Sequence, residues 1–220
     1  MKNLNFLEML KFKDGEDWLH RRIKGVKKAY FIPKEVKGIA IDIGANVGAF
    51  EIVNNEKFQK IIAIEPSKET FLKCSKNVKS YKNTEVYNFA VSNENNKIVK
   101  LRHYKNDFYS GNATTLDNSK WYNGDQYEEV STISLEGIFD IFHLKKINYL
   151  KIDCEGAEYD FLINKDLSKI DYIGIEIHVQ LGDKVIELMN HINKTHHVIT
   201  KRGDGKIKHF EITYKNNNLL

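Results

Sequence analysis

Short apolar runs alternate with amphipathic stretches from residue 38 to the end of the chain. This alternation is typical of a parallel β-sheet whose faces are covered by helices. The apolar runs are short enough to be buried strands, and the stretches between them carry apolar residues at helical spacing. The expected strands are 39–43, 60–64, 85–91, 147–153 and 172–178, and the expected helices are 47–58, 68–81, 155–163 and 181–194. The pattern predicts an α/β fold.

The rhythm changes in two places. Between the third and fourth strands we expect an inserted strand at 97–104 and then a long polar loop at 106–124. Loops of this length in compact domains are often binding elements. Near the C-terminus, 197–201 and 206–214 flank an Asp-Gly pair, which predicts an antiparallel hairpin.

The length of 220 residues suits one well-filled core, and 41% hydrophobic with 29% charged residues indicates a folded protein. We expect a domain at 38–220, with an insertion at about 93–130, preceded by a distinct segment at 1–37. Neither a signal peptide nor an apolar run of roughly 20 residues is visible, so we expect a cytoplasmic protein without a membrane span. Cys74 and Cys154 are expected to be small buried residues rather than a metal pair.

Positive charge is concentrated near the N-terminus. Residues 1–37 hold ten Lys or Arg against five acids, although the net charge of the chain is only +4. The dense part, 20–28, would suit an anionic partner such as nucleic acid or a phosphorylated sugar. A solvated helix face explains the same residues equally well, and both interpretations stay open.

A glycine-bearing turn follows the first strand. Gly44 and Gly48 flank it, and their missing side chains would let the backbone approach a ligand while the helix start offers N–H donors. Glu65 follows the second strand, 21 residues after Gly44, where an acid accepts hydrogen bonds from ribose hydroxyls in nucleotide-binding sheets. Together these residues predict a nucleoside ligand. The alternative is that the glycines only permit a tight turn.

The same turn discriminates between nucleoside ligands. Dinucleotide sites use G-x-G-x-x-G, and here Asn46 takes the place of the middle glycine. Asp42, at the strand end, would repel a pyrophosphate but would accept a hydrogen bond from the ammonium group of S-adenosylmethionine, directly or through water. The sequence therefore favours S-adenosylmethionine as the cofactor and disfavours NAD-linked redox chemistry.

Several motifs resemble those of the FkbM family of methyltransferases. They are 41–48 (IDIGANVG), 64–66 (IEP), 88–92 (NFAVS) and 150–158 (LKIDCEGAE). The resemblance implies a Rossmann-like class I methyltransferase with a mostly parallel seven-stranded sheet, helices on both faces and a C-terminal antiparallel hairpin. It also implies S-adenosylmethionine as the methyl donor and, usually, a hydroxyl oxygen of a small molecule or sugar as the acceptor. The expected cofactor-binding residues are Asp42, Gly44, Asn46, Gly48, Glu65, Pro66, Ala90, Val91 and Asp153.

Carboxylates crowd the end of the fourth strand, where a methyl acceptor would meet the donor: Asp153, Glu155 and Glu158. Crowded acids in a cleft have shifted pKa values, as a general base requires. We expect Asp153 to contact the substrate or the methionine end of the donor, and Glu155 is a second catalytic candidate. Stabilisation by a helix dipole is the alternative explanation for Glu155 and Glu158, because both fall in the first turn of an expected helix.

Glu176 and His178 alternate on the fifth strand, so their side chains are expected to share a face. If that strand ends in the cleft, His178 is a candidate catalytic base for an acceptor hydroxyl. We assign no metal site. An alternative assembly would use Asp153, Glu176 and His178 as ligands of a divalent cation that lowers the pKa of the acceptor.

Two competing functions stay open. The first is methylation of RNA or another nucleic acid, with the basic segment binding phosphates and aromatic residues in or beside the long loop stacking on bases. Those aromatic residues are Tyr104, Phe108, Tyr109, Trp121 and Tyr122. The second is a non-catalytic regulatory protein that keeps a nucleoside pocket. Neither the N-terminal segment nor the long loop matches a motif, so the resemblance does not identify the acceptor.

Overall fold

A computed structural model describes residues 18–103, 113–115, 127–179, 182–203 and 209–219. Its main sheet has seven strands in the order β10-β11-β9-β8-β1-β2-β3. The five strands from β9 to β3 are parallel, and β11 and β10 continue the sheet in antiparallel fashion. The bounds are β1 Ile39–Ile43, β2 Lys60–Ile64, β3 Thr84–Tyr87, β8 Tyr149–Ile152, β9 Tyr172–His178, β10 His196–Arg202 and β11 His209–Asn216. The predicted sheet and C-terminal hairpin are confirmed.

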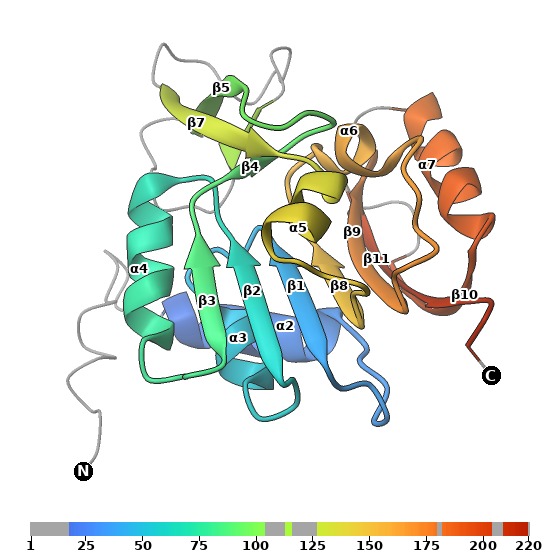
Figure 1. Ribbon diagram of the computed structural model, residues 1–220, viewed down its shortest axis with the longest axis horizontal. Coiled ribbons are helices and arrows are strands. Elements are labelled where there is room, and N and C mark those ends of the chain that lie inside the picture. Colours follow the sequence, from blue (N-terminus) through green and yellow to red (C-terminus); the bar gives the residue numbers. More distant parts are fainter. Residues whose placement is uncertain (1–17, 104–112, 116–126, 180–181, 204–208, 220) are drawn as a thin grey trace.

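Helices cover both faces of this sheet, as predicted (Figure 1). They are α2 Trp18–Ala29, α3 Ala49–Asn54, α4 Lys68–Val78, α5 Leu135–Ile141, α6 Glu158–Leu162 and α7 Asp183–Asn193. The strand period of two decides which helices each side chain meets. Ile41 and Ile43 pack with the helices α5, α6 and α7, whereas Ala40 packs with Phe50 of α3. Asp42 points to the same face as Ala40, and this places it beside α3.

Two helices are shorter than the hydrophobic pattern predicts, and positive backbone φ angles explain where each begins. Gly48 has φ 87° and caps α3, which therefore starts at Ala49 and not at residue 47. Glu155 has φ 52° and Gly156 has φ 103°, so α6 starts only at Glu158. A right-handed helix cannot include such residues. The carboxylate of Glu155 therefore lies in a turn before the helix.

The predicted strand 85–91 is wrong in one respect, because the chain leaves the main sheet in its middle. β3 ends at Tyr87, and β4, Ala90–Val91, pairs instead with β7, Tyr127–Ile133, in a second sheet. The side chain of Asn88 holds this crossing point, since its Nδ2 donates to the carbonyl oxygens of Glu65 and Pro66 at 2.8 and 2.7 Å.

The second sheet has the order β4-β7-β5-β6 and lies beyond the carboxyl ends of the central strands (Figure 1). β5, Ile98–His103, confirms the inserted strand predicted at 97–104. The pairing strands β6, Ala113–Thr114, and β7 were not predicted, and neither was α5. The sequence around β6 and β7 is too polar for its alternation to reveal these two strands.

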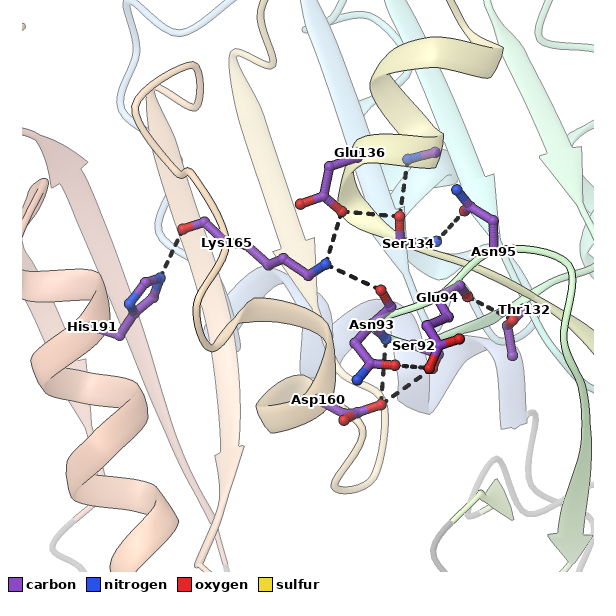
Figure 2. A network of polar contacts seen from close by, with 11 residues as sticks. Ser92, Asn93, Glu94, Asn95, Thr132, Ser134, Glu136, Asp160, Lys165 and His191 are labelled. Atoms are coloured by element: carbon purple, nitrogen blue, oxygen red, sulfur yellow. Dashed lines mark hydrogen bonds and ion pairs between the residues drawn. The ribbon is translucent and has the colours of Figure 1, made fainter.

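A polar network fastens this insertion to the main domain (Figure 2). The ammonium group of Lys165 donates to Glu136 Oε2 at 3.0 Å and to the carbonyl oxygen of Asn93 at 3.1 Å. Ser134 caps α5 by accepting the N–H of Gly137, and the carboxylate of Asp160 accepts the N–H of Asn93. These hydrogen bonds link the insertion and α5 to α6 and to the loop that follows α6.

Several predictions fall outside the described residues. They concern the long loop apart from residues 113–115, its aromatic side chains, and the Asp-Gly turn of the hairpin at 204–205. Within the described residues, no helix has the length and apolar character needed to cross a membrane.

Candidate active site

The loop after β1 needs its glycines for the fold itself. Gly44 has φ 73°, and a Cβ atom there would lie 1.8 Å from the carbonyl oxygen of Asp153. Gly48 has φ 87°, and its Cβ would lie 2.9 Å from a methyl group of Val78. Asn46 also has a positive φ, 53°, which Asn tolerates better than most residues. The loop therefore packs closely against the backbone after β8 on one side and against α4 on the other.

The N–H groups of this loop already have partners within the protein. Those of Gly44 and Ala45 donate to the carbonyl oxygen of Ile64 at 2.9 and 3.1 Å. That of Asn46 donates to Glu65 Oε2 at 2.8 Å. These three N–H groups are therefore used within the protein, and ligand binding by the N–H groups at the start of α3 stays a prediction. The bonds of the three N–H groups fix the loop to the end of β2.

Glu65 directly follows the end of β2, and two backbone N–H groups hold its carboxylate in place. Oε1 accepts the N–H of Ser67 at 3.0 Å, and Oε2 accepts that of Asn46. The residue is only 6% exposed, and burial raises the pKa of its carboxyl to about 7 although both N–H groups oppose this shift. Each oxygen keeps a lone pair for a hydroxyl donor.

Asp42 is fully buried and forms an ion pair that the sequence did not predict. Lys151 Nζ lies 2.8 Å from Asp42 Oδ1 and donates to the carbonyl oxygen of Gly44 at 2.8 Å. Burial lowers the pKa of Lys151, but the charges of Asp42 and Asp153 outweigh it and raise the pKa above its usual range. Glu51 of α3 is also fully buried, and burial, together with Asp42, raises the pKa of its carboxyl.

The turn after β8 carries Asp153 and Glu155. The Asp153 N–H donates to Ile43 at 3.0 Å, and the carbonyl oxygen of Glu155 accepts the hydroxyl of Thr114 at 2.9 Å. The Glu155 side chain is 24% exposed. Burial raises the pKa of its carboxyl to about 7, with His178 opposing and Asp153 assisting this shift.

Glu158 and His178 form a buried pair beneath this turn. Glu158 Oε1 accepts the backbone N–H of His178 at 2.9 Å and lies 3.2 Å from its Nδ1. Glu158 Oε2 accepts the N–H of Gly156 at 2.8 Å. Glu158 does begin α6, but it is fully buried, so its contacts are with His178 and the turn rather than with solvent at a helix end.

His178 also faces Glu155, in the turn after β8, and Glu176 of β9. Its Nε2 lies 3.4 Å from Glu155 Oε2 and 3.6 Å from Glu176 Oε1, which confirms that Glu176 and His178 share a face. Burial lowers the pKa of His178, but Glu158 and the other carboxylates outweigh it and raise the pKa to about 10. One ligand atom each of Asp153, Glu176 and His178 lies within 4.8 Å of the others.

Helix α2 supplies a wall of the site. Arg22 and Val26 of α2 are four residues apart and share one face of the helix, and Tyr30 follows directly after its end. All three residues line the main cleft. Tyr30 is 8% exposed, and its hydroxyl has no hydrogen-bond partner among the described residues. The N-terminal segment therefore contributes these three side chains to the site. Lys24 and Lys27 of the same segment are exposed.

The cleft covers the carboxyl ends of β1, β2 and β8 and contains about 980 Å³ of empty space, its open mouth included. Most of the predicted site residues line it: Asp42, Gly44, Asn46, Glu65, Pro66, Ala90, Val91, Asp153 and Glu155. Gly48 lies away from it against α4, and His178 lies behind Glu155. Lys151 and Tyr30 line the cleft without having been predicted.

The strand order of the main sheet and the cleft at the ends of the parallel strands show that the chain has a Rossmann-like class I methyltransferase fold. The sequence profile of the methyltransferase FkbM domain matches residues 42–201. The chain therefore belongs to the FkbM methyltransferase family, as its motifs predicted. No curated protein has a detectable sequence match to it.

Similar solved structures support the same fold. An FkbM methyltransferase from Methylobacillus flagellatus superimposes with a TM-score of 0.53 at 16% identity, over 80% of this chain and 42% of that one. A candidate tRNA methyltransferase from Streptococcus pneumoniae gives 0.51 at 11% identity, over 91% of this chain and 71% of that one. The chain thus spans less than half the length of the first protein. At such low identity these similarities concern the fold alone.

Proposed function

We propose that this chain transfers a methyl group from S-adenosylmethionine to a hydroxyl oxygen of a small molecule or sugar. The observation that carries the proposal is the buried carboxylate of Glu65, oriented by the N–H groups of Asn46 and Ser67 at the rim of the cleft. A carboxylate fixed in this way at the end of β2 is suited to accept both ribose hydroxyls of an adenosyl group.

The donor would then extend along the ends of the central strands. Pro66, Ala90 and Val91 line the cleft near Glu65 and offer apolar surface to an adenine ring. The methionine end would reach the side of Asp153. Asp42 is neutralised by Lys151, so its part is to hold the loop through that lysine, and any contact with the ammonium group would be secondary.

The reaction requires positioning more than chemical activation, since the sulfonium is already reactive. An acceptor oxygen attacks the methyl carbon, the carbon–sulfur bond breaks, and its electron pair stays on sulfur to give S-adenosylhomocysteine. The hydroxyl proton passes to a cleft carboxylate, for which Glu155 is best placed because it lines the cleft and is partly exposed. His178 is only 3% exposed and lies behind Glu155, so we assign it no role as the base.

Calorimetric titration tests the donor site. Wild-type protein should bind S-adenosylmethionine and S-adenosylhomocysteine but not NADH. Glu65→Gln should weaken S-adenosylhomocysteine binding about 10- to 100-fold, because it replaces one of the two oxygens that would accept the ribose hydroxyls. Glu69→Gln, an exposed acid on α4 paired with Lys73, is the matched control and should bind normally. Preferential NADH binding, or unchanged affinity in Glu65→Gln, would overturn the assignment.

A substrate test separates catalysis from binding alone. Acceptor hydroxyl compounds are screened for S-adenosylhomocysteine formation, and Glu155→Gln should then lower kcat about 100-fold while leaving donor affinity unchanged. Full turnover in Glu155→Gln would remove this residue as the base. Donor binding with no turnover on any acceptor class would favour a non-catalytic regulatory protein.

Methylation of nucleic acid is the second candidate function, and the exposed basic side chains of α2 favour it. Arg21, Lys24, Lys27 and Lys28 are all exposed next to the wall that Arg22 contributes to the cleft. If they bind phosphates, RNA affinity should fall steeply between low and moderate salt, with a slope that decreases by about one for each lysine removed. Salt-independent acceptor binding would favour a small molecule.

A further inference from the structure

We infer that Asp153, Glu176 and His178 form a binding site for one divalent first-row metal ion at the acceptor end of the cleft. Their ligand atoms come from the end of β8 and from β9 and lie within 4.8 Å of one another. An ion with bonds of about 2.1 Å keeps its ligand atoms within roughly 4.2 Å of each other. Small side-chain rotations therefore suffice to close the site.

The ligand types select the kind of ion. Carboxylate oxygens alone suit Mg²⁺ or Ca²⁺, but an imidazole nitrogen shifts the preference to ions such as Mn²⁺, Fe²⁺ or Zn²⁺. The separation of 3.6 Å between His178 Nε2 and Glu176 Oε1 is the spacing that two ligands of one such ion adopt. Asp153 lines the cleft, so the remaining positions of the ion would face it.

Glu158 orients the histidine for this role. It is fully buried, it faces Nδ1 at 3.2 Å, and it accepts the backbone N–H of the same residue. A carboxylate on one ring nitrogen fixes the tautomer and leaves the other nitrogen for a metal, as in carboxylate–histidine–metal triads. Nε2 is the nitrogen that faces Glu155 and Glu176.

Tyr30 is an independent sign that something polar binds here. Its hydroxyl is buried and has no hydrogen-bond partner among the described residues, although buried Tyr hydroxyls usually have one. Burial raises the pKa of this hydroxyl, and the charges of Asp153 and Glu176 raise it further. A water molecule or an acceptor oxygen bound to the ion would supply the missing partner.

The charge of the region points the same way. Asp153, Glu155, Glu158 and Glu176 surround the single imidazole of His178, and all are half-buried or buried. Burying several like charges is costly unless they are neutralised, either by protons or by a cation. A divalent ion would offset two of these charges at once, where a proton offsets only one.

The role of the ion rests on the proposed function. Bound beside the donor methyl group, it would hold the acceptor hydroxyl and lower its pKa by withdrawing electron density from oxygen. The acceptor class then narrows to compounds whose hydroxyl, or pair of adjacent hydroxyls, can bind a metal ion.

The test is a titration of the metal-stripped full chain with Mn²⁺ in the absence of S-adenosylmethionine. The electron paramagnetic resonance signal of the unbound ion measures how much Mn²⁺ remains free. Wild type should bind one Mn²⁺ per chain, and Glu176→Gln and His178→Asn should each weaken binding at least about 10- to 100-fold. Glu211→Gln is the matched control, because Glu211 pairs with Glu176 in register on β11 but is no ligand. It should change the affinity less than about threefold.

S-adenosylhomocysteine titration of the same variants keeps folding and the two proposals apart. Variants that bind S-adenosylhomocysteine normally but not Mn²⁺ support the site. No saturable binding by wild type up to millimolar Mn²⁺, or equal weakening in Glu211→Gln, would overturn it. If the wild type binds Mn²⁺ but does not bind S-adenosylhomocysteine, the proposed function is contradicted and the metal site is still supported.

Discussion

The two halves of the cleft are built on different principles. The donor half, around Gly44 and Glu65, is a short loop whose N–H groups bond to the next strand and to one carboxylate. The acceptor half, around Asp153 and His178, is a cluster of side chains from β8, α6 and β9, with carboxyl pKa values raised by burial. The first half has one geometry, fixed by the backbone. The second can exchange protons or bind a cation.

Lys151 joins the two halves, and its removal should have the largest effect. Lys151→Met leaves Asp42 buried without its cation and should lower the free energy of unfolding by about 3–5 kcal/mol, measured by urea denaturation. Lys97→Met removes an exposed ion pair with Glu94 and should cost at most about 1 kcal/mol. Equal losses in the two variants would show that Asp42 does not depend on Lys151.

Glu65 should make the donor half sensitive to pH. Its pKa is raised to about 7 in the folded chain, so the neutral form is favoured and its stabilising contribution is present below pH 4.5 and lost as the pH rises through 7. Relative to Glu65→Gln, the wild type should lose up to about 3 kcal/mol of stability between these values. Parallel pH–stability curves of the two proteins would contradict the raised pKa.

Gly44 tests how tightly the halves are joined, since its Cα faces the backbone of Asp153. Gly44→Ala should lower the free energy of unfolding by about 2–3 kcal/mol, because φ is positive and the added Cβ would lie 1.8 Å from the Asp153 carbonyl oxygen. It should also weaken S-adenosylhomocysteine binding. Gly25→Ala on α2 has open space around it and should stabilise the helix by about 0.5–1 kcal/mol. A tolerated Gly44→Ala would mean that the two turns move apart easily.

Thr114 should give the smallest effect, and it tests the link between the acceptor half and the insertion. Thr114→Val removes the hydroxyl that donates to the carbonyl oxygen of Glu155 at 2.9 Å and should cost about 1 kcal/mol. Thr114→Ser keeps that hydroxyl and should recover most of the loss in thermal or urea unfolding. Failure of Ser to recover it would assign the effect to packing of the threonine methyl group.

Local rules let the sequence predict much of the donor half. The parallel strands, the turn at residues 42–48 and the acid after β2 depend on neighbours in the chain, whose spacing the sequence displays directly. The shared face of Glu176 and His178 follows from the strand period alone. The same rules predicted that α3 and α6 begin too early, because hydrophobic spacing does not reveal residues with a positive φ.

The acceptor half depends on contacts that only the tertiary structure creates. The sequence by itself determined the class of fold, the family and the residues at each strand end. Packing decided the partners of those residues: Lys151 pairs with Asp42, and Glu158 pairs with His178. It also brought Tyr30, directly after α2, into the same cleft as Asp153. Burial gives such pairs their strength and shifts their pKa values. It results from packing between segments that lie from 20 to more than 100 residues apart, and no local pattern records this packing.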